Sequence, residues 1–431
     1  MIGAASMSAG RIAGAEPIAA DNAPSGPPLP PAPIGVSPAA LATDEAYWQQ
    51  VAAQYRVLDQ ATNFEAGYFG MMAQPVLAAY HRHIDRVNRE SSYFARRDYP
   101  ALAEAVRARV AAFIGAAVGE VAFSRNATEA LQTLIGQYNG VRAGDAVLFA
   151  DLDYPAMQVA MRGLAARRGA TPVMIDLPEP ASRASVIAAY ETALAAQPRT
   201  RLLLLTHCNN KTGLLLPVRE IAEMAHARGI DVVVDAAHSF GQVPLTIGEL
   251  GADFVGLNLH KWIGAPVGVG ALYIKADRLR MIDRSPGTDA DGPDTIDTRL
   301  VTGTTHFATI MTIPDALDFQ ASIGMPNKAA RLRYLRDRWV TKVRGVPGID
   351  VLTPDDPTMV GAITGVRLHG RGTRAANVAL QKTLVDEFAL FTHWRTGLAK
   401  GDCVRITPAL YNSVADADRM AAALMTIAAR G

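Results

Sequence analysis

The sequence predicts an α/β fold, in which a large, mostly parallel sheet is followed by a smaller α+β domain. Between residues 120 and 274, short apolar runs alternate with longer helical patterns. This alternation is typical of a parallel sheet with right-handed crossovers. The residues with the most reactive side chains each follow one of the apolar runs. Ligands of such sheets bind at the carboxyl ends of the strands, so we expect one site at that edge.

The composition agrees with a large globular protein. The chain has 431 residues, of which 49% are hydrophobic, enough for more than one domain and a sizeable core. With 42 basic and 41 acidic residues, the charge balance favours neither nucleic acid nor an acidic membrane surface as a partner. No apolar stretch approaches the ~18 residues of a membrane span. Two cysteines, Cys208 and Cys403, make neither a disulfide framework nor a metal site, and we expect no metal.

We divide the chain into four parts. Residues 1–40 are rich in Ala, Gly and Pro and form a disordered or extended lead-in. Residues 41–74 form an N-terminal segment, residues 75–312 a large cofactor-binding domain, and residues 313–431 a small C-terminal domain. The lead-in has one basic residue, Arg11, and no clear apolar stretch of a signal peptide. We therefore expect a cytoplasmic protein, and export through a truncated N-terminal signal stays an open alternative.

The elements follow one another in a regular order. A first helix begins near Asp44, where Thr43, Asp44 and Glu45 can cap it. The expected large-sheet strands are 120–124, 146–150, 173–177, 202–206, 232–235, 254–257 and 271–274. A helix at 76–89 is expected before these strands, and the helices expected between them are 126–138, 155–168, 184–196 and 218–228. A long helical region from Pro314 to Val343 leads to small-domain strands at 361–368 and 403–407.

A carboxylate and a lysine mark the centre of the sequence. Asp235 ends a β-branched strand, and Lys261 follows the next strand. A lysine amine can form a Schiff base with the aldehyde of pyridoxal phosphate, and a carboxylate can keep the pyridine nitrogen protonated. The ring then withdraws electrons from the Cα of an amino acid. Either residue alone would be an ordinary strand-end Asp or surface Lys, but the combination predicts pyridoxal phosphate as the cofactor.

A phosphate site is predicted where the strand 120–124 runs into a helix at Asn126. Free N–H groups and the positive end of the helix dipole both attract an anion there, and Thr128 adds a hydroxyl. The same pattern also fits a plain helix cap by Asn126. With Lys261 downstream, we favour the phosphate site.

These motifs together carry a resemblance to a known family. Asn258-Leu-His-Lys-Trp262, followed by Ala265 and Pro266, resembles the class V branch of fold-type-I pyridoxal-phosphate enzymes. This branch includes cysteine desulfurases, kynureninase-like enzymes and isopenicillin N epimerase. Asn258 and His238 are most similar to the isopenicillin-N-epimerase-like subgroup, and the resemblance spans roughly residues 60–425. It implies the aminotransferase-type fold and a homodimer with the active site at the subunit interface.

The resemblance assigns roles residue by residue. It implies that Ala127 and Thr128 hold the cofactor phosphate, that Tyr154 stacks on the ring and that Asn210 binds the ring hydroxyl. It also implies that His238 and His260 line the cofactor, that Thr304 reaches the phosphate of the other subunit, and that Arg405 holds the substrate α-carboxylate through a bidentate fork. Without it, Tyr154 would be a helix-start residue, Thr304 part of a turn and Arg405 a solvated side chain. Lys211 departs from the family, which usually has Glu there.

Two further stretches bear on the pocket. In the family, a segment comparable to residues 63–70 folds over the cofactor and lines the substrate pocket; an ordinary Gly-rich turn is the alternative. Arg96 and Arg97 are expected to include at least one solvated side chain, and either could face the substrate.

We predict pyridoxal-phosphate chemistry at the Cα of an amino-acid substrate, with Lys261 as the base. Epimerisation like that of isopenicillin N epimerase is favoured. An aminotransferase, a Cβ–S lyase and a non-catalytic binding protein of the same fold stay open. Tyr68, His306, His393 and, with less support, Tyr154 are candidates for a second acid. A cysteine desulfurase is not expected, because residues 389–400 lack a cysteine and Cys403 lies in a strand pattern, where we expect it to be buried.

Overall fold

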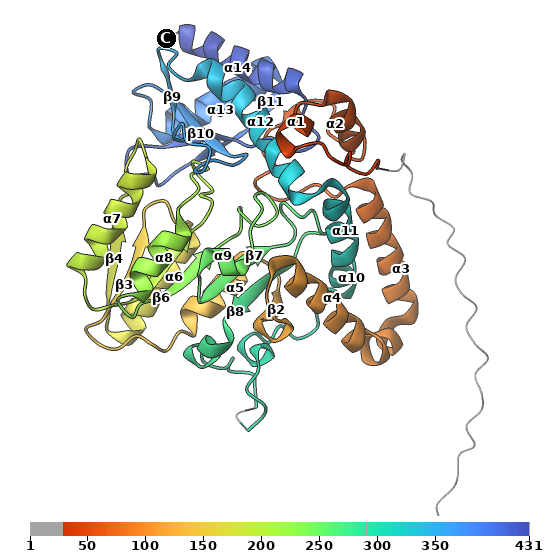
Figure 1. The fold of residues 1–431 in the computed structure, drawn as a ribbon, viewed down its shortest axis with the longest axis vertical. Coiled ribbons are helices and arrows are strands. Elements are labelled where there is room, and N and C mark those ends of the chain that lie inside the picture. The colour runs from red at the N-terminus through yellow and green to blue at the C-terminus, as the bar shows by residue number, and fades with distance from the viewer. Residues whose placement is uncertain (1–28, 290, 431) are drawn as a thin grey trace, which may run out of the picture.

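The computed structural model describes residues 29–289 and 291–430, and its centre is a seven-stranded sheet (Figure 1). The strand order is β2-β8-β7-β6-β5-β3-β4. The strands are β2 Val121–Ser124, β3 Ala146–Ala150, β4 Thr171–Ile175, β5 Thr200–Thr206, β6 Asp231–Asp235, β7 Phe254–Asn258 and β8 Gly270–Ile274. Strands β4, β3, β5, β6 and β7 pair in parallel, whereas β8 is antiparallel to both β7 and β2. The predicted mostly parallel sheet is confirmed. Its antiparallel strand is the one that follows β7 through a loop instead of a helix.

Both faces of this sheet are buried, as expected for a sheet flanked by crossover helices. Along β3, Val147 and Phe149 belong to one apolar cluster, and Leu148 and Ala150 belong to another on the opposite face. The helices of this region are α4 Tyr99–Ile114, α5 Ala127–Gly136, α6 Pro155–Arg168, α7 Arg183–Ala196, α8 Val218–His226 and α9 Ile247–Leu250. Helices α5 and α6 pack with the first cluster, and α4, α7 and α8 with the second.

The small sheet is antiparallel, with the order β12-β13-β10-β9. Its elements are β9 Ile349–Val351, β10 Thr364–Leu368, α13 Arg374–Phe388, β12 His393–Arg395, β13 Cys403–Ile406 and α14 Val414–Ala429. Two helices lead into it, α11 Ile313–Ile323 and α12 Met325–Val343. The prediction of a long helical region from Pro314 to Val343 is therefore wrong in one respect. The region is interrupted at Gly324, whose φ of 85° lies outside the range of an α-helix.

The N-terminal elements pack against the small domain and the helices beside it. Helices α1 Pro38–Leu41 and α2 Glu45–Ala52 precede β1 Thr62–Asn63, which pairs in parallel with β11 Leu390–Phe391. The predicted cap is present, since the Asp44 side chain accepts a hydrogen bond from the Tyr47 N–H. Of the predicted lead-in, residues 1–28 lie outside the described residues. The predicted boundary at residue 40 lies within α1, which begins at Pro38.

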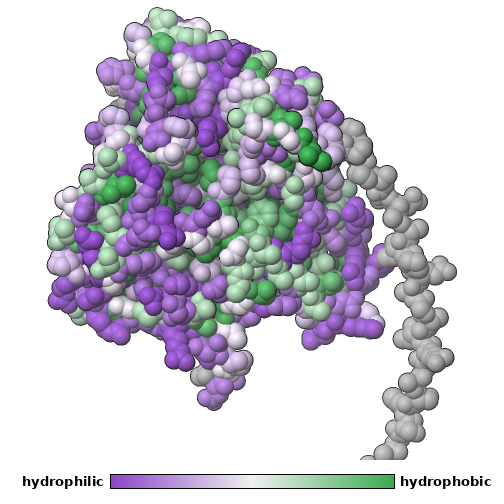
Figure 2. Space-filling view, in the orientation of Figure 1, coloured by the Kyte–Doolittle hydropathy of each residue, from purple (hydrophilic) through white to green (hydrophobic). Residues whose placement is uncertain are grey.

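On the side of the molecule away from α7, α3 Gln74–Arg97, α10 Phe307–Met311 and α11 lie side by side (Figure 1). Hydrophilic residues cover most of the face seen in Figure 2, and apolar residues show in the hollow between the small sheet above and the large sheet below. Among the described residues, no helix combines the length and the apolarity needed to cross a membrane.

Candidate active site

A cavity of about 320 Å³ lies where the carboxyl ends of β5, β6 and β7 meet the small sheet. Every predicted cofactor-binding and substrate-binding residue lines it except Thr304. The predicted residues that it brings together are Ala127, Thr128, Tyr154, Asn210, Asp235, His238, His260, Lys261 and Arg405. The parallel sheet is the reason, because it aligns the strand ends to which most of these side chains are attached.

Lys261 and Asp235, the two residues from which the cofactor was predicted, both line this cavity. The Lys261 Nζ lies 3.0 Å from the His238 Nε2. Burial and the nearby Arg405 guanidinium lower the pKa of Lys261 to about 8, so its nucleophilic neutral form is accessible near neutral pH. Asp235 is 5% exposed, and one carboxylate oxygen accepts the Ala237 N–H at 2.9 Å. Burial raises the pKa of this carboxyl, a cost that a protonated pyridine nitrogen beside it would offset.

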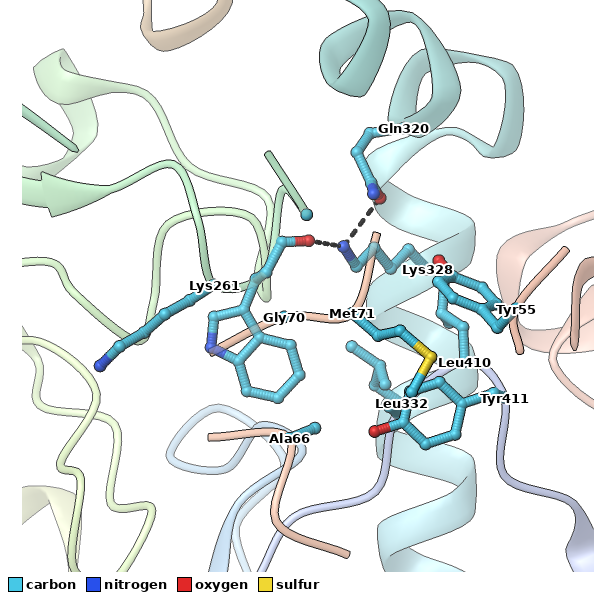
Figure 3. A pocket seen from close by; sticks show the side chains of 13 residues that line it. Tyr55, Ala66, Gly70, Met71, Lys261, Gln320, Lys328, Leu332, Leu410 and Tyr411 are labelled. Carbon is cyan, nitrogen blue, oxygen red and sulfur yellow. Dashed lines mark hydrogen bonds between the residues drawn. The ribbon is translucent and has the colours of Figure 1, made fainter. Parts of the chain in front are cut away.

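The turn that carries Lys261 is held through its backbone carbonyls. The Gly70 N–H donates to the His260 carbonyl at 2.8 Å, and the Gln320 Nε2 donates to the Ile263 carbonyl at 2.9 Å. The Lys328 Nζ donates to the Trp262 carbonyl and, at 2.7 Å, to the Gln320 Oε1. A small cavity of about 40 Å³ lies beside this turn. Figure 3 shows Gly70, Gln320 and Lys328 around it, with the Lys261 side chain pointing away.

The backbone of Gly70 lies directly on this turn. A Cβ at residue 70 would overlap the Lys261 carbonyl oxygen, so glycine is required there. Residues 64–70, which we call the strap, therefore run from the end of β1, which pairs with β11, to the Lys261 turn. Gly67 and Tyr68 of the strap line the 320 Å³ cavity, as predicted for this segment.

Two orphaned polar atoms show that the cavity fits pyridoxal phosphate. The Asn210 Oδ1 and the His238 Nδ1 are buried without a hydrogen-bond partner among the described residues. Unpaired buried polar atoms are costly, and a ligand bearing a hydroxyl group would satisfy the amide oxygen. Together with the Asp235 carboxylate and the Lys261 amine, they give the cavity groups for the ring hydroxyl, the ring nitrogen and the aldehyde of this cofactor.

The N-terminus of α5 supplies the expected place for the phosphate. Asn126 caps the helix by accepting the Glu129 N–H at 2.8 Å, so the cap interpretation is also correct. The Asn258 Oδ1 at the end of β7 accepts the Ala127 N–H at 2.8 Å and joins the helix to the strand that leads to Lys261. The Ala127 N–H is therefore already used, and Thr128 is the stronger candidate to bind a phosphate here. This role for Asn258 was not foreseen, because it links residues 131 positions apart.

The remaining cofactor residues are placed by different means. Tyr154 is 39% exposed and precedes α6 without capping it through its side chain, so its ring is free to face the cavity. The His260 Nδ1–H donates to the Val269 carbonyl at 2.7 Å, which fixes the ring. Burial lowers the pKa of His260 and keeps it neutral.

Arg405 lines the cavity, its predicted contact with the substrate carboxylate stays a prediction, and its guanidinium group contacts a residue that the sequence did not single out. Its Nε donates to the Glu65 Oε2 at 3.3 Å and its Nη2 to the Glu65 Oε1, while its Nη1 donates to the Asn210 carbonyl at 2.8 Å. A second arginine, Arg395, also donates to the Glu65 Oε1, at 2.6 Å. Neither Glu65 nor Arg395 was predicted as a site residue. The inclusion of Glu65 in the expected pocket segment was the only sequence signal.

Thr304 lies elsewhere, in a second cavity of about 690 Å³ beside α3. Within one chain it does not reach the first cavity, and its predicted contact with the partner's phosphate stays a prediction. His306 also lines the second cavity, where its Nε2 lies 3.3 Å from the Tyr80 hydroxyl. Arg96 lines the same cavity and is exposed, and the exposed Arg97 stacks on Tyr93.

Both cysteines are buried, as predicted for Cys403. Burial raises the pKa of the Cys208 thiol and of the Cys403 thiol to about 12 each. A buried thiol with a raised pKa is inert as a nucleophile.

Comparison with known proteins identifies the family. A family model described as aminotransferase class V matches residues 72–419. The chain is 32% identical to an isopenicillin N epimerase of Streptomyces clavuligerus, over 77% of this chain and 86% of that relative. It is 30% identical to the isopenicillin N epimerase of Amycolatopsis lactamdurans, over 88% of this chain and 98% of that relative. A solved cysteine desulfurase from Escherichia coli superposes with a TM-score of 0.75 at 22% identity, covering 89% of this chain and 98% of that one.

The protein therefore belongs to the class V aminotransferase family. Among its relatives are enzymes named isopenicillin N epimerase, at about one residue in three identical. This membership confirms the family resemblance, the fold and the cofactor, pyridoxal phosphate, that the sequence predicts.

Proposed function

We propose that this protein is a pyridoxal-phosphate enzyme that epimerises the Cα of an amino-acid substrate. The observation that carries the proposal is the cavity itself, in which Lys261, Asp235, His238 and the unpaired amide oxygen of Asn210 converge. When bound, the cofactor would hold the substrate amine covalently and accept the electron pair left at Cα after loss of its proton.

The residues of the chain would then move that proton. Lys261, once released from the cofactor, takes it, and its lowered pKa of about 8 suits a base that works near neutral pH. His238 orients the Lys261 amine through the 3.0 Å contact between Nζ and Nε2. Burial and the Lys261 charge lower the pKa of His238, so it stays neutral beside the amine.

Epimerisation needs a second group that returns a proton to the opposite face of Cα. Of the candidates, Tyr68 and Tyr154 line the cavity, whereas His306 lies in the second cavity and His393 is not among the lining residues. Tyr154 is assigned to the ring of the cofactor. We therefore propose Tyr68, which comes from the strap and not from the large sheet, as the second acid.

The buried cysteines weigh against a desulfurase, because that reaction needs an exposed thiol to accept sulfur. The two isopenicillin N epimerases match most of the chain, which favours epimerisation over the aminotransferase and lyase alternatives. We also propose a homodimer, with Thr304 of each subunit contributing to the partner's site. The intact pair of Asp235 and Lys261 favours an enzyme over a non-catalytic binding protein.

The test is incubation of the loaded enzyme with a panel of amino acids in deuterated water, followed by NMR at Cα. Deuterium at Cα together with inverted configuration is the expected result. A keto acid and pyridoxamine phosphate would identify an aminotransferase, and pyruvate with ammonia would identify a lyase. The Tyr68→Phe variant should retain deuterium exchange but lose inversion by about a hundredfold.

A further inference from the structure

Lys211 lies outside the active-site cavity but between the two domains that form it. It follows Asn210 in the turn after β5, is 2% exposed and is not among the residues that line the cavity. Its Nζ donates to the Asp151 carbonyl at 2.6 Å, in the loop after β3, and to the Gly397 carbonyl at 2.9 Å, in the loop between β12 and β13. One buried amine therefore joins the large domain to the small sheet.

A lysine suits this place because both of its partners are acceptors. An ammonium group has donors only, whereas a carboxylate has acceptors only. A glutamate at position 211, which the family resemblance makes the expected residue, would oppose its oxygens to two carbonyl oxygens. Burial lowers the pKa of Lys211, and the Asp151 carboxylate opposes this effect. The departure from the expected residue therefore agrees with the contacts that the side chain makes.

Gly397, Leu398 and Ala399, which we call the latch, contact the large domain at each residue. The Gly397 carbonyl accepts from Lys211, and the Ala399 N–H donates to the Asp151 Oδ2 at 3.2 Å. Between them, Leu398 is 7% exposed and belongs to the apolar cluster on one face of the large sheet, not to the cluster that fills the small domain. The latch thus has an apolar anchor between two polar contacts.

The large-domain side of this contact does not depend on Lys211 alone. The Gln158 Nε2 also donates to the Asp151 carbonyl, at 2.9 Å, and to the Asp153 carbonyl, at 3.0 Å. These hydrogen bonds hold the loop that leads to Tyr154. Loss of the Lys211 amine should therefore loosen the latch and leave the loop after β3 in place.

The latch connects the two strands that carry the arginines of the cavity. Arg395 ends β12 and Arg405 lies on β13, and both line the cavity. We propose that Lys211 is a positioning residue: it fastens the latch to the large domain and so holds Arg405, the predicted ligand of the substrate carboxylate, in place over the cavity. This inference rests on the proposed function, since it assumes an amino-acid substrate.

Two amines without a proton on the carbon next to nitrogen test the proposal on the loaded enzyme. They are tert-butylamine, which has no carboxylate, and 2-aminoisobutyrate, which has one, and their binding is followed by the absorbance of the bound cofactor. The Lys211→Met variant should lose about tenfold in affinity for 2-aminoisobutyrate and retain its affinity for tert-butylamine within about twofold, because only the carboxylate ligand is displaced. The Leu398→Ala variant, which weakens the latch without changing Lys211, should show the same selective loss.

Hydrogen exchange followed by mass spectrometry reports on the latch without any substrate. In Lys211→Met, peptides that cover residues 396–402 should exchange about tenfold faster, whereas peptides that cover residues 148–158 should be unchanged. The matched control is Lys400→Met. Lys400 follows the latch and is exposed, and its Nζ donates to the Glu179 carbonyl at 2.6 Å. A surface contact of this kind contributes little, so exchange and both affinities should stay within about twofold of native.

The outcomes separate this inference from the proposed function. Equal losses for both amines in Lys211→Met, or unchanged exchange of residues 396–402, would overturn the inference alone. If amino acids show no deuterium exchange at Cα with native enzyme, the proposed function fails and with it the role toward the substrate, while hydrogen exchange still decides whether Lys211 fastens the latch.

Two further variants decide the matter if Lys211→Met does not fold. Lys211→Arg keeps charged donors at this position and should bind 2-aminoisobutyrate within about threefold of native. Leu398→Ala should still show the selective loss, and equal losses for the two amines in this variant would overturn the inference.

Discussion

The two walls of the active-site cavity are built on different principles. The large-sheet wall consists of side chains at or just beyond the ends of successive parallel strands, such as Asp235 at the end of β6 and Lys261 after β7. The small-domain wall is a buried ionic cluster of Glu65, Arg395 and Arg405, whose members come from the strap and from two antiparallel strands. The first wall carries reactive groups with displaced pKa values, and the second carries charges that neutralise one another. The two walls are built separately but are coupled through charge, because Arg405 of the second wall helps to lower the pKa of Lys261 in the first.

The largest effect should come from the large-sheet wall. The Lys261→Ala variant should lose activity by about a thousandfold or more, because it removes both the covalent attachment point and the base. Borohydride treatment of the loaded enzyme, followed by peptide mapping, should label Lys261. A label on Lys211 or Lys275 would contradict the assignment. The fold should be preserved, since Lys261 makes no ion pair that the small domain depends on.

Removing the carboxylate of the opposite wall should instead affect stability. The Glu65→Ala variant leaves two buried guanidinium groups unpaired and should lower the free energy of unfolding by about 3–5 kcal/mol. The matched control is Asp386→Ala, which breaks an exposed ion pair with Lys382 in the same domain and should cost at most about 0.5 kcal/mol. If urea unfolding shows the same loss of unfolding free energy in both variants, burial of the cluster does not increase its contribution to stability.

Lys328 supports the large-sheet wall from behind and should make stability depend on pH. Burial lowers its pKa to about 7 in the folded protein, against about 10.4 in the unfolded chain. Between these values the unfolded chain binds more protons, so stability should fall as pH decreases from about 10 to about 7. The Lys328→Met variant lacks this titration. Relative to the native protein, the variant should therefore be more stable at pH 7 than at pH 10. A difference that is independent of pH would exclude the titration of Lys328.

The smallest effect is expected from the thiol at the boundary of the two walls. Cys403 is buried on β13 and its Sγ lies 3.6 Å from the Lys211 carbonyl oxygen. The Cys403→Ser variant should retain activity within about twofold, because an inert thiol takes no part in the reaction. Sulfide release from cysteine that disappears in this variant would contradict the prediction and favour a desulfurase.

The same difference between the walls explains what could be predicted from the sequence. Each large-sheet strand is a short apolar run followed by a polar residue, and parallel pairing brings all such ends to one edge. The positions of Asp235, Lys261 and Asn210 therefore followed from local patterns together with the family resemblance. Arg405 was found through the resemblance, but its partner was not. Glu65 lies 340 positions from Arg405 in the chain, and no local sequence pattern predicts that its carboxylate accepts hydrogen bonds from the Arg405 guanidinium group.

The sequence by itself determined the alternating order of strands and helices and, through the motifs that carry the family resemblance, the cofactor, because these depend on neighbours in the chain. The tertiary structure alone decided which charges are neutralised. It bends the strap across the cavity, pairs Glu65 with two arginines and places Lys328 behind the Lys261 turn. These contacts join segments far apart in sequence, and their energies depend on burial, which arises only when the two domains pack around the cavity.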